Sequence, residues 1–422
     1  MKIAVIVDHD VDLLNGASRQ SRQFVDWLVG HGHEVHLIFP APRRRRESPK
    51  AGLRIYSVPS FSVPSYREYR IPLPPLAPAL WLRRWKIDLV HAETMNPTLL
   101  LLGYWMVRRS GKPMFNVLTT NLPYYAPILL PRDNAARKLV FRVGKAMMNA
   151  ISNRIDGTFI LSEGMRERLT RDFYAIDQDK VFPLIRPMDP AGFAARNEPS
   201  DIGERLAIRR GCRLVTLSRL CQTKNVDFLV RAFAHRIYPK NPSLHLIVAG
   251  EGPLEESLRG LSAGLGCPNV HFPGRVPFGA VPAFLGEADF FLCASLSEAF
   301  GNIVCEAKYA GVPVIALDDK GGVRAQIIDR RTGFLVSPAD EEEFGRRFFE
   351  LFDDPGLQQE IRRQAREDVL VNHSPDKIYA NLLAIYDRAA RGEKPDGREI
   401  SRTYSYDRSF IGSGISPDRR QS

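Results

Sequence analysis

The stretch ADFFLCASLSEAFGNIVCEAKYAGVPVIA (288–316) decides the fold, because it contains a strand, a loop, a helix and a second strand in that order. The apolar run DFFLCAS (289–295) leads into a polar loop, and a helical segment opens near Gly301. A second apolar run, PVIAL (313–317), follows the helix. Two such strands joined by a helix lie parallel in one sheet. We therefore predict an α/β fold with a parallel sheet.

The same alternation of strand and helix extends to both sides of this stretch. In the second half we predict further strands at CRLVTLSRL (212–220), LHLIVAG (244–250) and VHFPG (270–274). In the first half we predict strands at KIAVIV (2–7), EVHLIF (34–39), DLVHAE (88–93), MFNVLTT (114–120) and GTFILS (157–162). The chain should therefore form two doubly wound parallel-sheet domains that face a central cleft.

A segment rich in Pro and Gly (183–203) divides the two halves. We predict an N-terminal α/β domain over 1–190 and a second α/β domain over 200–373. An amphipathic helix within 374–392 is expected to return to the first domain, and the polar tail 393–422 is expected to be disordered. Ligands of open α/β sheets bind beyond the carboxyl ends of the strands, so two such edges suit a long ligand.

The bulk composition is that of a soluble enzyme. Of the 422 residues, 44% are hydrophobic and 25% are charged. No apolar stretch reaches the roughly 18 residues needed to span a bilayer, and the N-terminus does not read as a signal peptide. The five cysteines match no metal spacing, so we expect free thiols. A cytoplasmic location is predicted.

The positive charge of the chain is concentrated in one half. Residues 1–190 carry the whole net charge of +11, and the remainder is neutral. This asymmetry favours an anionic partner such as a membrane surface or a phosphorylated acceptor, although a merely basic surface would look the same. We find no fingerprint of a DNA- or RNA-binding module, so nucleic acid is not expected as a partner. Nothing in the sequence indicates an oligomeric state.

Two cations follow a predicted strand in SRLCQTKN (218–225). Arg219 and Lys224 could stabilise the negative charge that a diphosphate leaving group gains as its bond to a sugar breaks. No metal ion would then be needed. Asp318 and Asp319 are adjacent carboxylates, but no further ligands accompany them, so we predict no metal site.

Glu298 and Glu306 flank the start of the helix that opens near Gly301. If the whole segment were helical, the two carboxylates would be separated by roughly 12 Å along the axis. This separation suits the two ends of one ligand better than an acid and a base at a single bond. Gly301 has no side chain, so a phosphate could approach the free N–H groups at the helix start.

The ordered motifs resemble those of the retaining glycosyltransferases of family 4, which have the GT-B fold. The resemblance rests on SRLCQTKN (218–225), VAGEGPLEESL (248–258), the stretch 288–316 and GGVRAQIIDRRTGFLV (321–336). Two N-terminal pieces, 15–35 and 58–74, are similar to the subgroup that glycosylates membrane lipids. The resemblance covers about residues 1–390.

This resemblance implies a site for a nucleotide-sugar donor, with UDP- or GDP-linked sugars favoured and no cofactor. Glu298 would bind hydroxyls of the sugar, and Glu306 would accept both hydroxyls of the ribose. Other donor-binding positions implied by the resemblance are Phe300, Gly301, Asn302 and Ile303 at the diphosphate, and Gly16, Gly250, Glu251 and Val276 elsewhere. Where the family often has a glutamate, this chain has Ala325 followed by Gln326.

The stretch VLTTNLPYYAP (117–127) departs from the family pattern. Many relatives have a histidine where this chain has Asn121, and asparagine cannot act as a base near neutral pH. In retaining enzymes of this type the leaving phosphate is thought to take the acceptor proton, so a positioning asparagine could suffice. Loss of activity is the alternative. Tyr124 and Tyr125 either shape the acceptor entrance or are packed aromatics. His91 and Glu93 end a strand, and we favour a structural role for the histidine.

A basic amphipathic helix is predicted over 134–152. Lys138, Arg142 and Lys145 share one face, whereas Val140, Val143, Met147 and Ile151 share the opposite face. The helix could lie on anionic lipid, or it could be an ordinary surface helix.

We therefore predict a retaining, metal-independent glycosyltransferase that moves a hexosyl unit from a nucleotide sugar to an acceptor hydroxyl. A membrane lipid is the favoured acceptor, and the enzyme would work as a peripheral protein on the inner face of the membrane. Transfer to a polysaccharide or to a lipid-linked oligosaccharide is an alternative. A sugar-nucleotide epimerase and an inactive membrane scaffold are further alternatives.

Overall fold

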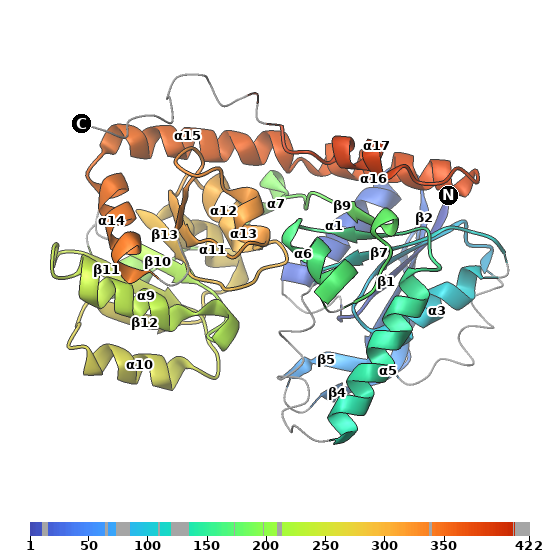
Figure 1. Ribbon diagram of the computed structural model, residues 1–422, viewed down its shortest axis with the longest axis horizontal. Helices are drawn as coiled ribbons and strands as arrows, with labels where there is room; N and C mark the ends of the chain where they lie inside the picture. The colour runs from blue at the N-terminus through green and yellow to red at the C-terminus, as the bar shows by residue number, and fades with distance from the viewer. Residues whose placement is uncertain are drawn as a thin grey trace. The chain divides into compact units, whose positions relative to one another are not determined.

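The computed structural model describes residues 1–10, 16–63, 66–72, 85–108, 110–119, 135–172, 174–196, 198–208, 213–336, 340–407 and 409. These residues form two compact units (Figure 1). The first unit consists of Met1–Arg186 and Asp376–Ser405, and the second of Pro187–Pro375 with Tyr406 and Asp407. Each unit contains a sheet built largely of parallel strands, so the predicted α/β class is confirmed.

The sheet of the first unit follows the order β3-β4-β2-β1-β6-β7-β8-β9 within the described residues, and β5 pairs with β4. Its inner strand β1 is almost wholly buried, as expected of a parallel strand covered on both faces. The strands of this unit are β1 (Lys2–Val7), β2 (Glu34–Ala41), β3 (Arg46–Lys50), β4 (Leu53–Val63), β5 (Tyr66–Pro72), β6 (Leu89–Glu93), β7 (Met114–Leu118), β8 (Gly157–Ile160) and β9 (Val181–Pro183).

One edge of this sheet departs from the predicted parallel pattern, because β3 and β5 both run antiparallel to β4. Ala51 and Gly52 alone connect β3 to β4, and Gly52 adopts a φ of +77°. A two-residue turn can join antiparallel neighbours but not parallel ones. The exposed, charged sequence of β3 gives no apolar signal from which a strand could be predicted.

Helices cover the first sheet, and the last of them corrects a prediction. They are α1 (Gly16–Gly30), α3 (Pro97–Val107), α5 (Ala135–Ser152), α6 (Gly164–Glu167), α16 (Pro375–Ala390) and α17 (Gly397–Thr403). We expected disorder from residue 393 onward, but α17 packs on β9 with Ile400 and Tyr404 buried. Asp396 caps this short helix by accepting bonds from two of its backbone N–H groups.

The sheet of the second unit has the order β12-β11-β10-β13-β14-β15 within the described residues, and the pairs are parallel. In chain order this is 3-2-1-4-5-6, so the winding reverses between β10 and β13. The strands are β10 (Arg213–Leu217), β11 (His245–Ala249), β12 (Val270–Gly274), β13 (Phe290–Cys293), β14 (Val314–Leu317) and β15 (Phe334–Val336).

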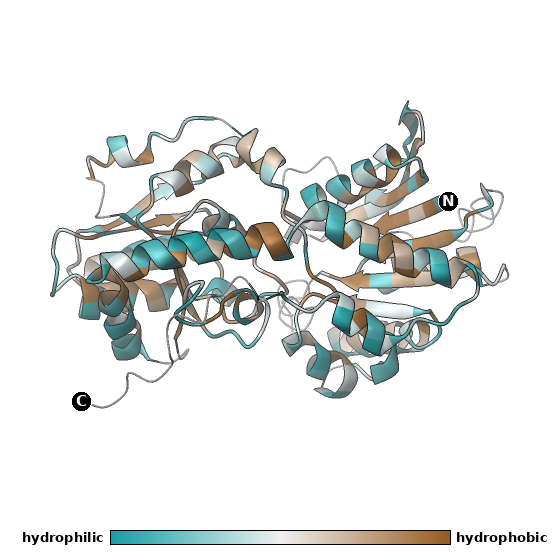
Figure 2. Ribbon diagram, turned by 90° about the horizontal axis from the view of Figure 1, so that it is seen from above, coloured by the Kyte–Doolittle hydropathy of each residue, from teal (hydrophilic) through white to brown (hydrophobic). Residues whose placement is uncertain are grey.

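Helices pack around this sheet and enclose an aromatic core. They are α7 (Pro190–Ala194), α8 (Ile202–Arg205), α9 (Val226–Ala232), α10 (Glu255–Gly264), α11 (Val281–Gly286), α12 (Asn302–Tyr309), α13 (Gly322–Gln326), α14 (Glu341–Phe352) and α15 (Pro355–Asn372). Phe233, Phe344 and Phe348 are fully buried in this core. Figure 2 shows the strands as largely hydrophobic, whereas the helices mix hydrophilic and hydrophobic residues.

Buried ion pairing fixes α12 to α15. The Lys308 ammonium is fully buried and bonds both to the carboxylate of Asp368 and to the carbonyl oxygen of Gln326. Asn372 donates to the other oxygen of Asp368 at 2.7 Å. A buried charge without a partner is costly, so this network holds α12 in one position.

Candidate functional site

The candidate site of the second unit lies at the carboxyl ends of β10, β13 and β14. β10 and β13 are the neighbours between which the winding of the sheet reverses. Arg219 and Lys224 follow β10, and Glu298 follows β13. Reversal of the winding opens a crevice at the carboxyl edge, which is where open α/β sheets bind ligands.

Lys224 and Glu298 meet across this reversal point. The ammonium of Lys224 donates to the Glu298 carboxylate, and the two side chains are 21% and 16% exposed. The loops that carry them are joined by a backbone bond of 3.0 Å from Leu296 N–H to the Thr223 carbonyl oxygen. Arg219, which precedes Lys224 in the same loop, is exposed. The structure thus places a cation and a carboxylate side by side at the carboxyl ends of β10 and β13.

Asp319 organises the loops around this ion pair. Its carboxylate accepts backbone N–H groups from Glu298 at 2.9 Å, Gly321 at 2.8 Å, Arg324 at 3.1 Å and Val323 at 3.4 Å. Burial raises the pKa of this carboxyl group, and the four N–H bonds oppose the rise. Asp319 therefore acts as a structural centre for the loop that holds Glu298, a role that its sequence context did not reveal.

The start of α12 has the geometry that the sequence predicted. Gly301 adopts a left-handed φ of +89° and caps α12. Phe300 is buried, and Asn302 and Ile303 are half-buried in the first turn. The side-chain amide of Gln326 donates to the carbonyl oxygens of Phe300 and Gly301, which fixes the backbone just before the helix.

Gly322 explains why a second glycine is needed beside this turn. A Cβ atom added at Gly322 would lie 2.4 Å from the Phe300 Cα atom. The loop of Gly321 and Gly322 therefore touches the backbone before α12. A direct bond of 2.9 Å from Gly322 N–H to the Glu298 carbonyl oxygen completes this contact.

Glu306 is held by a partner that the sequence analysis missed. The Arg196 guanidinium donates from Nη2 to Oε1 of Glu306 at 3.0 Å, and the side chains are 7% and 14% exposed. Arg196 lies in the stretch that we interpreted as a joint between domains. No motif marks it, because its partner is more than a hundred residues away in the chain.

The glycine-rich turn after β11 has a structural reason for its first glycine, and the predicted contact with the nucleotide stays a prediction. A Cβ atom at Gly250 would lie 1.8 Å from the Ser218 carbonyl oxygen, and the φ of Gly250 is +126°. Because Gly250 has no side chain, the backbone of Ser218 can lie against it, directly before Arg219. Glu251 is exposed there, and its carbonyl oxygen accepts the Leu220 N–H at 2.9 Å. Val276 is buried in the loop after β12.

Three predicted site residues of the first half fall outside the described residues. These are Asn121, Tyr124 and Tyr125. Gly16 is the first residue of α1. His91 is buried, and its Nδ1 lies 2.6 Å from the Tyr386 hydroxyl while its Nε2 lies 3.2 Å from Glu93. These contacts agree with the structural role that we favoured for the histidine.

Glu93 belongs to a buried polar cluster at the end of β6. Burial alone would raise its pKa, but the hydrogen bond and charge of His91, the charge of Arg186 and a hydrogen bond from Ser21 lower the pKa to about 2. The Ser21 hydroxyl donates to Glu93 at 2.5 Å. The carboxylate is therefore ionised and fully engaged in holding α1 to β6.

Helix α5 exposes apolar and basic residues together along part of its length. Leu139 is 61% exposed and Val143 is 50% exposed. Lys138, Arg142 and Lys145 lie on the same exposed part of the helix. The predicted apolar face is thus only partly correct, because Ile151 is buried whereas Val143 is not. α5 packs against α3.

The described residues contain no cluster of three or more His, Cys, Asp or Glu side chains arranged to hold a metal ion. Asp318 pairs with Arg324, and Asp319 is bound by backbone N–H groups. The four described cysteines are free thiols. In the same part of the chain, no helix has the length and apolarity required to cross a membrane.

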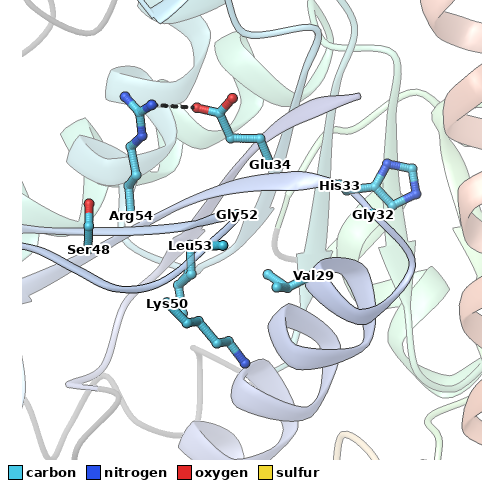
Figure 3. A pocket seen from close by; sticks show the side chains of 10 residues that line it. Val29, Gly32, His33, Glu34, Ser48, Lys50, Gly52, Leu53 and Arg54 are labelled. Carbon is cyan, nitrogen blue, oxygen red and sulfur yellow. Dashed lines mark ion pairs between the residues drawn. The ribbon is translucent and has the colours of Figure 1, made fainter.

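A pocket of about 550 Å³ lies at the β3–β4 edge of the first sheet (Figure 3). It is formed by the end of α1 and the β3–β4 turn, and it is lined by His33, Glu34, Lys50 and Arg54 among others. Arg54 and Glu34 form an ion pair across it at 3.2 Å. It adjoins the amino end of β2, whereas ligands of open α/β sheets bind at the carboxyl ends. No predicted site residue lines it.

Comparison with known proteins gives matches over both halves of the chain. The family model described as glycosyl transferases group 1 matches residues 210–368, and the model described as Glycosyltransferase Family 4 matches residues 14–184. An alpha-monoglucosyldiacylglycerol synthase from Streptococcus pneumoniae is 26% identical over 75% of this chain and 71% of its own length. A GDP-mannose-dependent alpha-mannosyltransferase from Mycolicibacterium smegmatis is 28% identical over 80% of this chain and 84% of its own length.

The solved structures agree on the fold. HepE from Anabaena, solved in complex with UDP, has a TM-score of 0.68 and 18% identity, and the match covers 91% of this chain and 99% of HepE. At this level of identity the likeness shows the GT-B fold alone. The family models and the curated relatives carry the assignment beyond the fold.

Proposed function

Because the chain belongs to the glycosyltransferases of group 1 and family 4, with the GT-B fold, we propose that it transfers a hexosyl unit from a nucleotide sugar to a hydroxyl group of a membrane lipid. The proposed reaction retains configuration at the sugar carbon and uses no metal. The bond from C1 to the leaving phosphate breaks, and a bond from C1 to the acceptor oxygen forms on the same face. The acceptor proton passes to the leaving phosphate.

The Lys224–Glu298 pair at the reversal point of the sheet carries this proposal. A leaving diphosphate gains charge as C1 departs, and a fixed cation stabilises that charge more in the transition state than before it. Lys224 is such a cation, and Arg219 follows the same strand. Glu298, held by Asp319, can accept hydrogen bonds from sugar hydroxyls beside it.

The nucleotide end of the donor is assigned to Glu306. Its carboxylate is half-buried on the first turns of α12, which begins at the left-handed Gly301. Free N–H groups at the start of a helix suit a phosphate, so the diphosphate would lie between the two glutamates. The names of the relatives support UDP or GDP as the nucleotide, because one relative uses GDP-mannose and HepE was solved with UDP.

A lipid acceptor is supported by a relative and by α5. The relative from Streptococcus pneumoniae is named for a glucosyldiacylglycerol product. On α5, exposed Leu139 and Val143 alternate with basic residues, and the whole net positive charge of the chain falls in residues 1–190. Apolar side chains that enter a bilayer beside cations that meet anionic headgroups would bind a peripheral protein to the inner face of the membrane.

The donor site is tested by three single substitutions assayed with a labelled nucleotide sugar. Arg219→Ala and Lys224→Ala should each lower kcat by about 10²-fold, because each removes a charge that stabilises the leaving group. Glu306→Ala should chiefly raise the KM for the donor. Arg205→Ala, at an exposed surface ion pair, is the matched control and should leave turnover unchanged. Unchanged turnover in all three site variants would refute the assignment.

The same assay separates the acceptor classes. Labelled lipid product partitions into organic solvent, whereas a polysaccharide product stays in water. Consumption of donor without any acceptor would indicate an epimerase, and absence of turnover with every acceptor would indicate an inactive scaffold. A thermal-shift screen against UDP-, GDP- and ADP-sugars identifies the nucleotide before the assay.

The membrane surface is tested by vesicle sedimentation. Replacing Lys138, Arg142 and Lys145 by Gln should weaken binding to anionic vesicles by about 10²-fold, because each basic residue contributes about 1 kcal/mol. Binding to vesicles of neutral lipid should change little. Equal binding of wild type and variant to anionic vesicles would favour an ordinary surface helix.

A further inference from the structure

Arg196 has an environment that is unusual for a surface arginine. Its guanidinium carbon lies 4.5 Å from the ring centroid of Phe193 and 4.5 Å from that of Phe278. Its Nη2 donates to Glu306 at 3.0 Å, and the side chain is 7% exposed. Two aromatic faces and a carboxylate therefore fix the plane and the direction of the guanidinium.

The segment that carries Arg196 is fixed by its own contacts. Asp189 caps α7 by accepting the Gly192 N–H at 2.9 Å. Phe193 packs edge-on against Tyr309 of α12, with ring centroids 5.5 Å apart. Glu198 lies so close to the loop after β12 that a Cβ atom at Gly279 would meet its carboxylate at 2.3 Å. Arg196 is thus positioned by packing on both α12 and that loop.

We propose that Arg196 is a positioning residue that fixes the Glu306 carboxylate for two ribose hydroxyls, and so makes the enzyme selective for ribonucleotide donors. This inference rests on the proposed donor site. A carboxylate has about four acceptor positions, so it can bind an arginine and two hydroxyls at the same time. A glutamate that is already fixed loses less rotamer entropy on binding, which increases affinity.

The fixed carboxylate also accounts for discrimination. A donor without the 2′-hydroxyl would leave one acceptor position of a partly buried carboxylate unfilled, which is costly. If Arg196 is removed, Glu306 loses the bond that fixes its direction, and the missing hydroxyl matters less. Arg196 should therefore affect the binding of the ribonucleotide more than that of the deoxyribonucleotide. A merely structural residue would weaken both equally.

The test measures the Kd of UDP, 2′-deoxy-UDP, GDP and 2′-deoxy-GDP by titration calorimetry on the full chain. For the nucleotide that binds, wild type should prefer the ribose form by about tenfold, the value of one hydrogen bond to a charged group. Arg196→Met should weaken the ribose form by about tenfold and the deoxy form by less than about threefold. Glu306→Gln should reduce the preference in the same way, and Arg205→Met should change neither affinity.

The outcomes separate this inference from the proposed function. If Glu306→Gln reduces the preference but Arg196→Met does not, Arg196 has no positioning role and only this inference fails. If Arg196→Met binds the ribose form more tightly, Arg196 competes with the ligand, and the inference is overturned. If wild type binds none of the four nucleotides, the proposed donor site fails as well. Arg196→Lys, which keeps the charge without the planar stacking, should give an intermediate preference and serves if Arg196→Met does not fold.

Discussion

Asp319→Asn tests the claim that one carboxylate organises the loops of the candidate site. The substitution keeps the size of the side chain but removes the charge and one of the two acceptor oxygens. In the structure, Oδ1 accepts the N–H groups of Gly321 and Arg324, and Oδ2 accepts those of Glu298 and Val323. An amide oxygen can serve one of these pairs, and the NH₂ group would then face the other pair.

The magnitude follows from the two N–H groups that lose their acceptor. An unsatisfied N–H group costs about 1–3 kcal/mol when buried. The Glu298 bond is well formed at 2.9 Å, whereas the Val323 bond is long at 3.4 Å. We therefore expect a loss of about 3 kcal/mol, which corresponds to a Tm decrease of about 6–12 °C for a domain of this size. Release of the Glu298 backbone should also lower transfer by about 10²-fold.

The assay is a thermal melt followed by circular dichroism, paired with the turnover assay. Asp318→Asn is the matched control, because this neighbouring carboxylate pairs with Arg324, whose side chain is 58% exposed. An ion pair with so exposed a partner contributes at most about 1 kcal/mol. Equal Tm values for the two variants would refute the claim that Asp319 organises the loop.

Three further predictions concern other parts of the chain. Lys308→Met should destabilise the second unit by about 3–5 kcal/mol in urea unfolding, since it leaves the Asp368 carboxylate buried without a cationic partner, and Asp368→Leu in the same chain should restore most of the loss. Gly250→Ala should lower donor turnover more than tenfold, as its Cβ atom would lie 1.8 Å from the Ser218 carbonyl oxygen and displace the Arg219 loop. Because the pKa of Glu93 is lowered from 4.5 to about 2, its contribution of about 3 kcal/mol is present above pH 4.5 and is lost as the pH falls toward 2. Tryptophan fluorescence should report this loss, since all four tryptophans lie before residue 106.

The strands could be predicted from the sequence because buried parallel strands appear as continuous apolar runs. β1, β11 and β13 each coincide with such a run, and the turns between them begin with polar or glycine residues. The positions of Lys224 and Glu298 followed from the ends of their strands. Because β10 and β13 are neighbours in the sheet, the loops that follow them, and with them the two side chains, lie close together.

Partners that are distant in the sequence could not be predicted. The Arg196–Glu306 and Asp319–Glu298 contacts depend on how loops pack, and no local pattern encodes that packing. The same holds for the contact of Gly250 with the Ser218 backbone, which leaves no room for a side chain at this position. Helix α17 was missed because its segment is short and polar. Its few apolar residues give too little periodic signal to predict a helix.

Residues Asp376–Ser405 belong to the first unit, and this has a consequence for folding during translation. Tyr386 contacts His91 across 295 positions of sequence and stacks on Phe115, so these rings lack their cover until Tyr386 has been translated. The second unit, although made later, has most of its chain available before the first unit can close its core. Domains generally fold as they emerge, from the N-terminus onward. In this protein the unit whose synthesis begins first therefore completes its core only after most of the second unit has been made.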